Sequence, residues 1–168
     1  MNVLAAVAVG SNLMSGFGGR EANLREAVRR VGELGRVVAV SSFYDTEPVG
    51  YVDQPRFLNG ALLLETELGA LELMRGLLGV ERAMGRERNV LKGAIPKGPR
   101  VIDLDLLLFG DLVMETAELT VPHPAMGERR FVLEPLAEVA GDMLHPVSGL
   151  TVGEMLRAVA FIKAMAQG

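Results

Sequence analysis

Two aspartates inside an apolar segment place the strongest constraint on the fold of this chain. Residues 98–109 read Gly-Pro-Arg-Val-Ile-Asp-Leu-Asp-Leu-Leu-Leu-Phe. In a β-strand, successive side chains point to opposite faces, so Asp103 and Asp105 should share one face, about 7 Å apart along the chain. The opposite face should then carry the apolar residues Ile102, Leu104, Leu106 and Leu108. The segment therefore predicts a strand that presents two carboxylates on one side.

Two carboxylates on one face repel each other, so folding alone gives no reason to place them together. Oxygen ligands of this kind suit a hard cation, and we predict that Asp103 and Asp105 bind magnesium. The simpler alternative is a pair of solvated carboxylates at the end of a strand. The surrounding charge favours the metal site, because residues 82–100 hold six basic side chains and one acidic one in a chain of net charge −4.

A metal beside a basic loop is suited to a polyphosphate, since magnesium bridges phosphate oxygens and arginine neutralises charge on the transferring group. Neither glycine-rich phosphate-binding motif, G-x-x-x-x-G-K-[ST] or G-x-G-x-x-G, occurs in the chain. A nucleotide would therefore be held by side chains and metal, with Arg86, Arg88 and Arg100 as the candidates. The alternative for these arginines is a solvated basic loop.

The remaining periodicity predicts an α+β fold, a ferredoxin-like sandwich with an antiparallel-dominated sheet of about four main strands flanked by helices. We expect one domain over residues 1–168. The predicted strands are 3–9, 37–44, 57–64 and the aspartate segment. The predicted helices are 21–34, 71–84, 130–139 and 152–165. Residues 85–99 lack apolar periodicity and are long for a connection, so we predict a lid or a binding loop.

Composition narrows the class of protein. The chain has no cysteine, which excludes disulfides and a cysteine nucleophile. No apolar run reaches membrane-spanning length and no signal peptide is recognised, so we expect a cytoplasmic protein without membrane association. The acidic net charge argues against nucleic acid as a partner. Nothing in the sequence decides the oligomeric state, and a monomer is compatible with it.

Two further positions suggest binding. Phe57 and Asn59 are two residues apart in a predicted strand, hence on one face, where an aromatic ring and an amide suit a flat heterocycle; an ordinary core phenylalanine with a satisfied asparagine is nearly as good an explanation. His123 lies between two prolines that restrict its backbone, with a capping or packing role as the alternative. His145 has no charged sequence neighbours, and we interpret it as structural.

Several motifs, in order along residues 3–146, resemble the 6-hydroxymethyl-7,8-dihydropterin pyrophosphokinase family of folate biosynthesis. These are Gly10-Ser11-Asn12-Leu13, Ser41-Ser42-Phe43-Tyr44-x-Thr46-Glu47-Pro48-x-Gly50, Asp53-Gln54-Pro55-x-Phe57-Leu58-Asn59, Gly85-Arg86-x-Arg88, Gly98-Pro99-Arg100-x-Ile102-Asp103-Leu104-Asp105 and Val121-Pro122-His123-Pro124. The resemblance implies transfer of pyrophosphate from ATP to the hydroxymethyl oxygen of the pterin, with release of AMP and two magnesium ions as cofactors.

The resemblance also implies a role for each matching position. Both metals would be bound by Asp103 and Asp105, and the catalytic group would be Arg86, Arg100, Asp103 and Asp105. The ATP side would comprise Glu81, Arg88, Arg100, Leu106, Thr120, His123 and Arg129. The pterin pocket would comprise Thr46, Pro48, Val49, Phe57, Asn59 and Phe131.

The chain departs from the family pattern at a few positions. Lys97 stands where the family often has an aromatic residue, and Val101 where threonine is common. The segments 14–19 and 89–96 lengthen two loops, and a longer lid could alter closure or product release. Two alternatives remain open from the residues: another magnesium-dependent nucleotidyl-transferring enzyme, and a non-catalytic metabolite-sensing module.

Overall fold

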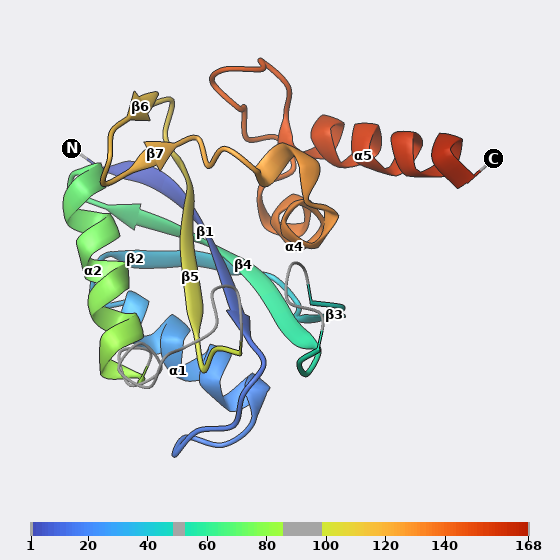
Figure 1. Cartoon of the computed structure of the whole chain (residues 1–168). Coiled ribbons are helices and arrows are strands. Elements are labelled where there is room, and N and C mark those ends of the chain that lie inside the picture. The colour runs from blue at the N-terminus through green and yellow to red at the C-terminus, as the bar shows by residue number, and fades with distance from the viewer. Residues whose placement is uncertain (1, 49–52, 86–98, 168) are drawn as a thin grey trace.

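An antiparallel sheet with helices on both faces forms the body of the protein (Figure 1). The computed structural model describes residues 2–48, 53–85 and 99–167. The strands of the sheet are β1 (Val3–Ser11), β2 (Arg36–Val40), β3 (Tyr44–Thr46), β4 (Phe57–Thr66) and β5 (Asp103–Phe109). The helices are α1 (Arg20–Val31), α2 (Ala70–Ala83), α4 (Arg130–Ala140) and α5 (Val152–Gln167). A two-stranded ribbon of β6 (Met114–Glu115) and β7 (Thr120–Val121) and a 3-10 turn, η1 (Met126–Glu128), complete the described elements.

The strand order is β2-β4-β1-β5, every neighbouring pair is antiparallel, and β3 pairs with β4. With two helices inserted between the strands, this order is that of a ferredoxin-like sandwich, and the α+β prediction is confirmed. The central strand β1 is a continuous run of small apolar residues, which suits a strand covered on both faces.

Each face of the sheet has its own core. The first core lies under α1 and α2, where Leu24, Leu73 and Leu77 pack against Val7 and Leu64 of the sheet. The second lies under α4 and α5 and contains residues such as Leu133, Leu136 and Val152 against Ala61 and Leu63. Figure 1 shows α4 and α5 on the opposite side of the sheet from α2. The face under α4 is the one that also carries the predicted site.

A β-bulge changes the expected alternation in β5. Ala6 of β1 pairs with Leu108 and Val7 pairs with Leu106, which leaves Leu107 as an extra residue. Before the bulge, Leu104 and Leu106 lie in the first core, as predicted. After it, Leu108 lies in the second core together with Leu107, so the expectation that Leu108 shares a face with Leu104 is wrong. From Leu108 onward, the extra residue exchanges which side chains point to each face of the sheet.

The strand predicted over residues 37–44 is divided in two. The Oγ of Ser41 accepts a hydrogen bond from the backbone N–H of Ala61 (2.9 Å), where a strand would offer a carbonyl. The ladder stops at Val40 and starts again at Tyr44 as β3. A serine side chain that competes for a backbone group is a known way to interrupt regular structure. After the break the chain continues as β3, which carries Thr46 of the predicted site.

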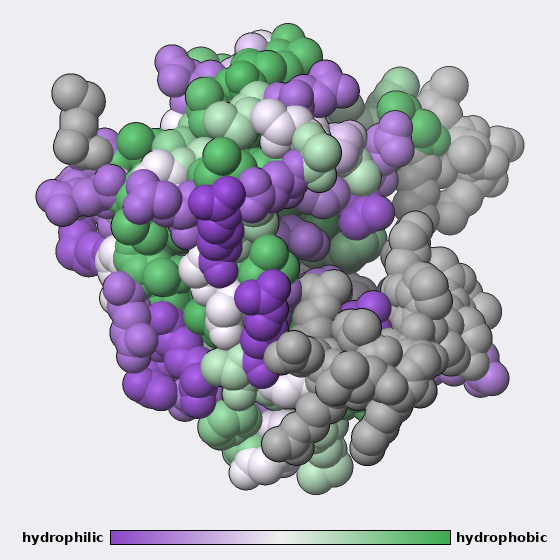
Figure 2. Space-filling model, turned by 60° about the vertical axis from the view of Figure 1, so that its left-hand side comes forward, coloured by the Kyte–Doolittle hydropathy of each residue, from purple (hydrophilic) through white to green (hydrophobic). Residues whose placement is uncertain are grey.

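The described surface mixes polar and apolar residues. Figure 2 shows hydrophilic side chains spread over the described part of one face, with hydrophobic side chains between them. Among the described residues, no helix combines the length and the apolar character needed to cross a membrane.

Candidate active site

A pocket of about 310 Å³ lies between the sheet and the start of α4. This volume falls in the range of small-molecule sites, which begins at about 300 Å³. The residues that line it come from β1, the β3 strand and the residue after it, β4, β5 and its entrance, the segment between β7 and α4, and the first turn of α4. They are Ala8, Val9, Gly10, Thr46, Glu47, Phe57, Asn59, Gly60, Arg100, Asp103, Asp105, His123, Arg129, Phe131 and Val132.

The floor of the pocket is a row of paired residues across three strands. Gly10 in the central strand pairs with Asn59 of β4 on one side and with Asp103 of β5 on the other. Paired residues in antiparallel strands point to the same face, so Asn59 and Asp103 both face the pocket. Glycine at position 10 leaves the space between them open, and a Cβ there would lie 2.8 Å from Oδ1 of Asn59.

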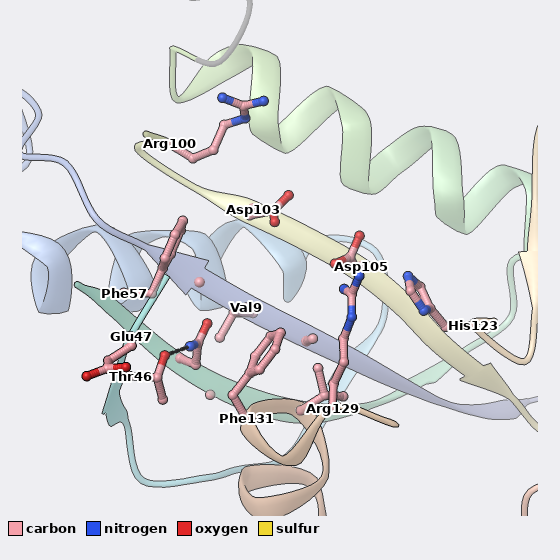
Figure 3. Close-up of a pocket in the computed structure, with 15 residues that line it drawn as sticks. Val9, Thr46, Glu47, Phe57, Arg100, Asp103, Asp105, His123, Arg129 and Phe131 are labelled. Carbon is pink, nitrogen blue, oxygen red and sulfur yellow. Dashed lines mark hydrogen bonds between the residues drawn. The ribbon is translucent and has the colours of Figure 1, made fainter. Parts of the chain in front are cut away.

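One end of the pocket, here called the aromatic half, consists of Thr46, Phe57, Asn59 and Phe131. Figure 3 shows the rings of Phe57, from β4, and Phe131, from α4. The Asn59 amide nitrogen donates a hydrogen bond to the Thr46 hydroxyl. Flat rings beside an oriented amide suit a planar heterocycle, which can stack and form hydrogen bonds in its own plane. Phe57 and Asn59 thus share one face, as predicted.

The other end, here called the phosphate half, consists of Arg100, Asp103, Asp105, His123 and Arg129. Figure 3 shows both aspartates rising from the same side of β5, with Arg100 at the entrance of that strand. Among the described residues, no cluster of three or more carboxylate, histidine or cysteine side chains forms a closed metal cage. Two carboxylates leave coordination positions for phosphate oxygens and water, which suits magnesium. This half therefore suits an enzyme that transfers a phosphate-bearing group.

His123 and Arg129 are oriented by their own neighbours. Nδ1 of His123 accepts a hydrogen bond from the backbone N–H of Ala125 (3.2 Å), so the neutral ring carries its proton on Nε2. Burial, and then the positive charge of Arg129, lower the pKa of His123, although the charge of Asp103 opposes this. The Arg129 guanidinium lies over the Phe131 ring, 5.7 Å from its centroid. Arg129 thereby connects the two halves of the pocket.

Some residues that the resemblance assigned to binding do not line this pocket. Glu81 is 1% exposed, and its Oε2 accepts a hydrogen bond from the backbone N–H of Leu104 (2.8 Å), between the two aspartates. Leu106 is buried in the first core, Thr120 lies in β7, and Pro48 is half-buried outside the lining. Their roles in binding stay predictions. The predicted positions Val49, Arg86 and Arg88, and most of the predicted lid, lie outside the described residues.

One contact that shapes the pocket has no signal in the sequence. Glu138 of α4 accepts hydrogen bonds from the backbone N–H (2.9 Å) and hydroxyl (2.8 Å) of Ser42 and from the Tyr44 hydroxyl (2.6 Å). The bond from Tyr44, followed by those from Ser42, lowers the pKa of Glu138. The same contact raises the pKa of Tyr44 to about 12. Because β3 also carries Thr46, this contact fixes one wall of the aromatic half to α4.

Comparison with known proteins identifies the family. A family model described as 7,8-dihydro-6-hydroxymethylpterin-pyrophosphokinase (HPPK) matches residues 6–141. A 2-amino-4-hydroxy-6-hydroxymethyldihydropteridine pyrophosphokinase of Bacillus subtilis is 46% identical over 141 residues, 83% of this chain and 79% of the relative. The enzyme of that name from Pseudomonas aeruginosa is 43% identical over 155 residues, 92% of this chain and 91% of the relative.

Longer proteins contain the same unit. A folic acid synthesis protein of Schizosaccharomyces pombe, fol1, is 38% identical over 157 residues, and the match covers 92% of this chain but 20% of that protein. The crystal structure of Plasmodium falciparum HPPK-DHPS with pteroate has a TM-score of 0.75 at 14% identity and covers all of this chain and 44% of that one, which shows a shared fold. The chain thus spans a minor part of these longer proteins and most of the bacterial relatives.

The chain belongs to the HPPK family, the enzymes that transfer pyrophosphate from ATP to hydroxymethyldihydropterin in folate biosynthesis. Membership of this family decides against the two alternatives that the residues left open, another magnesium-dependent nucleotidyl-transferring enzyme and a non-catalytic metabolite-sensing module. The resemblance drawn from the motifs is confirmed.

Proposed function

We propose that the pocket in Figure 3 is where this chain carries out the family reaction, with ATP in the phosphate half and the pterin in the aromatic half. One observation carries the proposal: a single pocket contains both Asp103 and Asp105 and the pair Phe57 and Phe131. A transfer between two substrates needs their reacting atoms side by side. The two halves are adjacent because Gly10 pairs with Asn59 on one side and with Asp103 on the other.

In the phosphate half, Asp103 and Asp105 are the residues that would hold two magnesium ions. When bound, these ions neutralise charge on the ATP phosphates. Arg100 is placed to stabilise charge on the transferring group, because a guanidinium forms strong bonds to phosphate oxygens. The neutral His123 ring offers its Nε2–H as a donor to the same region. Arg86 is proposed to assist Arg100, on the family resemblance alone.

In the aromatic half, the pterin ring would stack on Phe57 and Phe131 while Asn59 reads its edge. The hydrogen bond from the Asn59 amide nitrogen to Thr46 holds that side chain in place and leaves Oδ1 as an acceptor for a ring N–H. Because these side chains are already ordered, binding of the ring costs little additional side-chain entropy. The hydroxymethyl group would then point toward the phosphate half.

The test is direct product analysis. We expect the protein, incubated with ATP, magnesium and 6-hydroxymethyl-7,8-dihydropterin, to release one AMP for each pterin diphosphate formed, as measured by chromatography. A matched pterin that carries a methyl group in place of the hydroxymethyl group should give no AMP, because it lacks the attacking oxygen. Absence of AMP with the hydroxymethyl substrate, or release of ADP in its place, would contradict the proposal.

A further inference from the structure

A buried asparagine joins the segments that lead into the two halves of the pocket. Asn12 follows β1 directly, is 2% exposed and does not line the pocket itself. On one side, the Asn12 Oδ1 accepts a hydrogen bond from the backbone N–H of Arg100 (2.8 Å), and the backbone N–H of Asn12 donates to the Arg100 carbonyl (3.0 Å). On the other side, its Nδ2 donates to Gln54 Oε1 (2.8 Å) and to the Pro55 carbonyl (2.9 Å).

The two bonded segments enter different halves of the pocket. Arg100 comes three residues before Asp103, in the phosphate half, while Pro55 comes two residues before Phe57, in the aromatic half. Both polar atoms of the Asn12 side chain are hydrogen-bonded: Nδ2 donates both of its hydrogens, and Oδ1 accepts one bond. An amide buried with a full set of bonds has one stable orientation, because breaking any of them leaves a polar group unsatisfied.

We infer that Asn12 is a positioning residue that sets the separation between the ATP and pterin halves of the site. The inference rests on the proposed function, and it assigns to Asn12 no contact with either substrate. Transfer between two bound substrates depends steeply on their separation, and a misplacement of about 1 Å can reduce the rate roughly 100-fold. Loss of the Asn12 bonds should therefore lower kcat more than it weakens the binding of either substrate alone.

Asn12→Asp separates the two sides of the link. The carboxylate still accepts the N–H of Arg100, but its second oxygen replaces the NH2 group and faces the Pro55 carbonyl oxygen. The Gln54 amide can rotate to donate to this oxygen, whereas the Pro55 carbonyl can only repel it. Asn23→Asp is the matched control, since Asn23 is fully buried and its side-chain bonds reach only the end of β1, at Ser11, and the β1–α1 connection, at Leu13 and Ser15. Gln54→Met is a second variant that removes one acceptor without adding charge.

We expect Asn12→Asp to lower kcat for AMP formation about 100-fold with KM for ATP changed less than about threefold. Gln54→Met should lower kcat several-fold, and Asn23→Asp should stay within about threefold of the original chain. If Asn12→Asp does not fold, Gln54→Met decides. A kcat within threefold for the deciding variant, or an equal loss in Asn23→Asp, would overturn the inference, because the effect would then be general destabilisation.

Amide hydrogen exchange gives a readout that does not depend on turnover. The link predicts faster exchange over residues 53–60 in Asn12→Asp, where the bond to Pro55 is lost, and a smaller change over residues 99–105, where the acceptor for Arg100 is kept; exchange in both segments should stay unchanged within about twofold in Asn23→Asp. Unaltered exchange in Asn12→Asp would overturn the link. Failure of the proposed function is distinguishable, since it would show in the original chain as absence of AMP.

Discussion

The backbone of Gly10 lies so close to the side chain of Asn59 that a Cβ at position 10 would come within 2.8 Å of the Asn59 Oδ1. Gly10→Ala should therefore turn the Asn59 amide away from Thr46 while leaving the strands paired, because the end of a flexible side chain can move. We expect KM for the pterin to rise about tenfold, the equivalent of one lost hydrogen bond of about 1.4 kcal/mol, with KM for ATP nearly constant.

Gly16→Ala is the control for that measurement, since nothing lies within 4 Å of the added Cβ. Steady-state kinetics on both variants, with each substrate varied in turn, would decide the matter. Equal changes in the two Michaelis constants of Gly10→Ala would contradict the prediction.

Asp105→Ala should preserve the fold and remove activity. The substitution takes away one of two like charges on β5, so we expect the unfolding temperature to stay close to that of the original chain. Turnover should fall roughly 10²- to 10³-fold or more if the carboxylate holds the metal that neutralises the phosphates. Asp111→Ala, an exposed aspartate in the turn after the same strand, is the matched control for AMP release and thermal melting. Comparable activity in the two variants would refute the metal role.

The contact of Glu138 with Tyr44 should make stability depend on pH in two ranges. The pKa of Glu138 is lowered below its ordinary value of 4.5, so its stabilising effect is complete above that value and is lost as pH falls through the lower folded pKa. The pKa of Tyr44 is raised from 10.0 to about 12, so its contribution is complete below pH 10 and is lost toward pH 12.

Urea unfolding at a series of pH values measures both effects. Glu138→Gln should show a smaller loss of stability on acidification than the original chain, because the titrating group is gone. Glu134→Gln, one turn earlier in α4, is the control and should keep the acid sensitivity of the original chain. Identical pH profiles for Glu138→Gln and the original chain would count against the contact.

Two glycines of α2 should respond differently to alanine. Gly79 is exposed, and nothing lies within 4 Å of an added Cβ, so Gly79→Ala should raise the free energy of unfolding by about 0.5–1 kcal/mol. At Gly76 a Cβ would lie 2.8 Å from a methyl group of Leu34, which packs against the first core. Gly76→Ala should raise the free energy of unfolding by less than Gly79→Ala does, or lower it. The comparison needs only denaturant unfolding, and a larger gain at Gly76 would be the contrary result.

Periodicity predicted most of the fold because the strongest patterns are local. The apolar run after Val3 and the amphipathic spacing of Leu24 and Ala27 predicted a strand and a helix, as observed. Two features depended on contacts that no pattern displays. The break at Ser41 depends on a hydroxyl reaching Ala61, twenty residues away, and the bulge at Leu107 depends on pairing with β1.

The candidate site was predictable where the chemistry of a residue is unusual for its place. Asp103 and Asp105 in an apolar strand, and Asn59 beside Phe57, stood out for that reason, and all four line the pocket. Glu138 gave no such signal, because an acidic residue on an amphipathic helix is ordinary and its partners lie more than ninety residues away. Contacts of that range come from the fold and not from spacing.

The extra residue at Leu107 divides β5 into two parts that differ in which residues face each core. Its first part keeps strict alternation and aims Asp103 and Asp105 into the pocket, while its last part supplies Leu108 to the core under α4 and Phe109 to the core under α1 and α2. One strand thereby supplies two carboxylates to the pocket and two consecutive leucines, Leu107 and Leu108, to the core beneath α4, which strict alternation would not allow. Val132 belongs to that core and also lines the pocket, so the packing beneath α4 and the lining of the site are built as one unit.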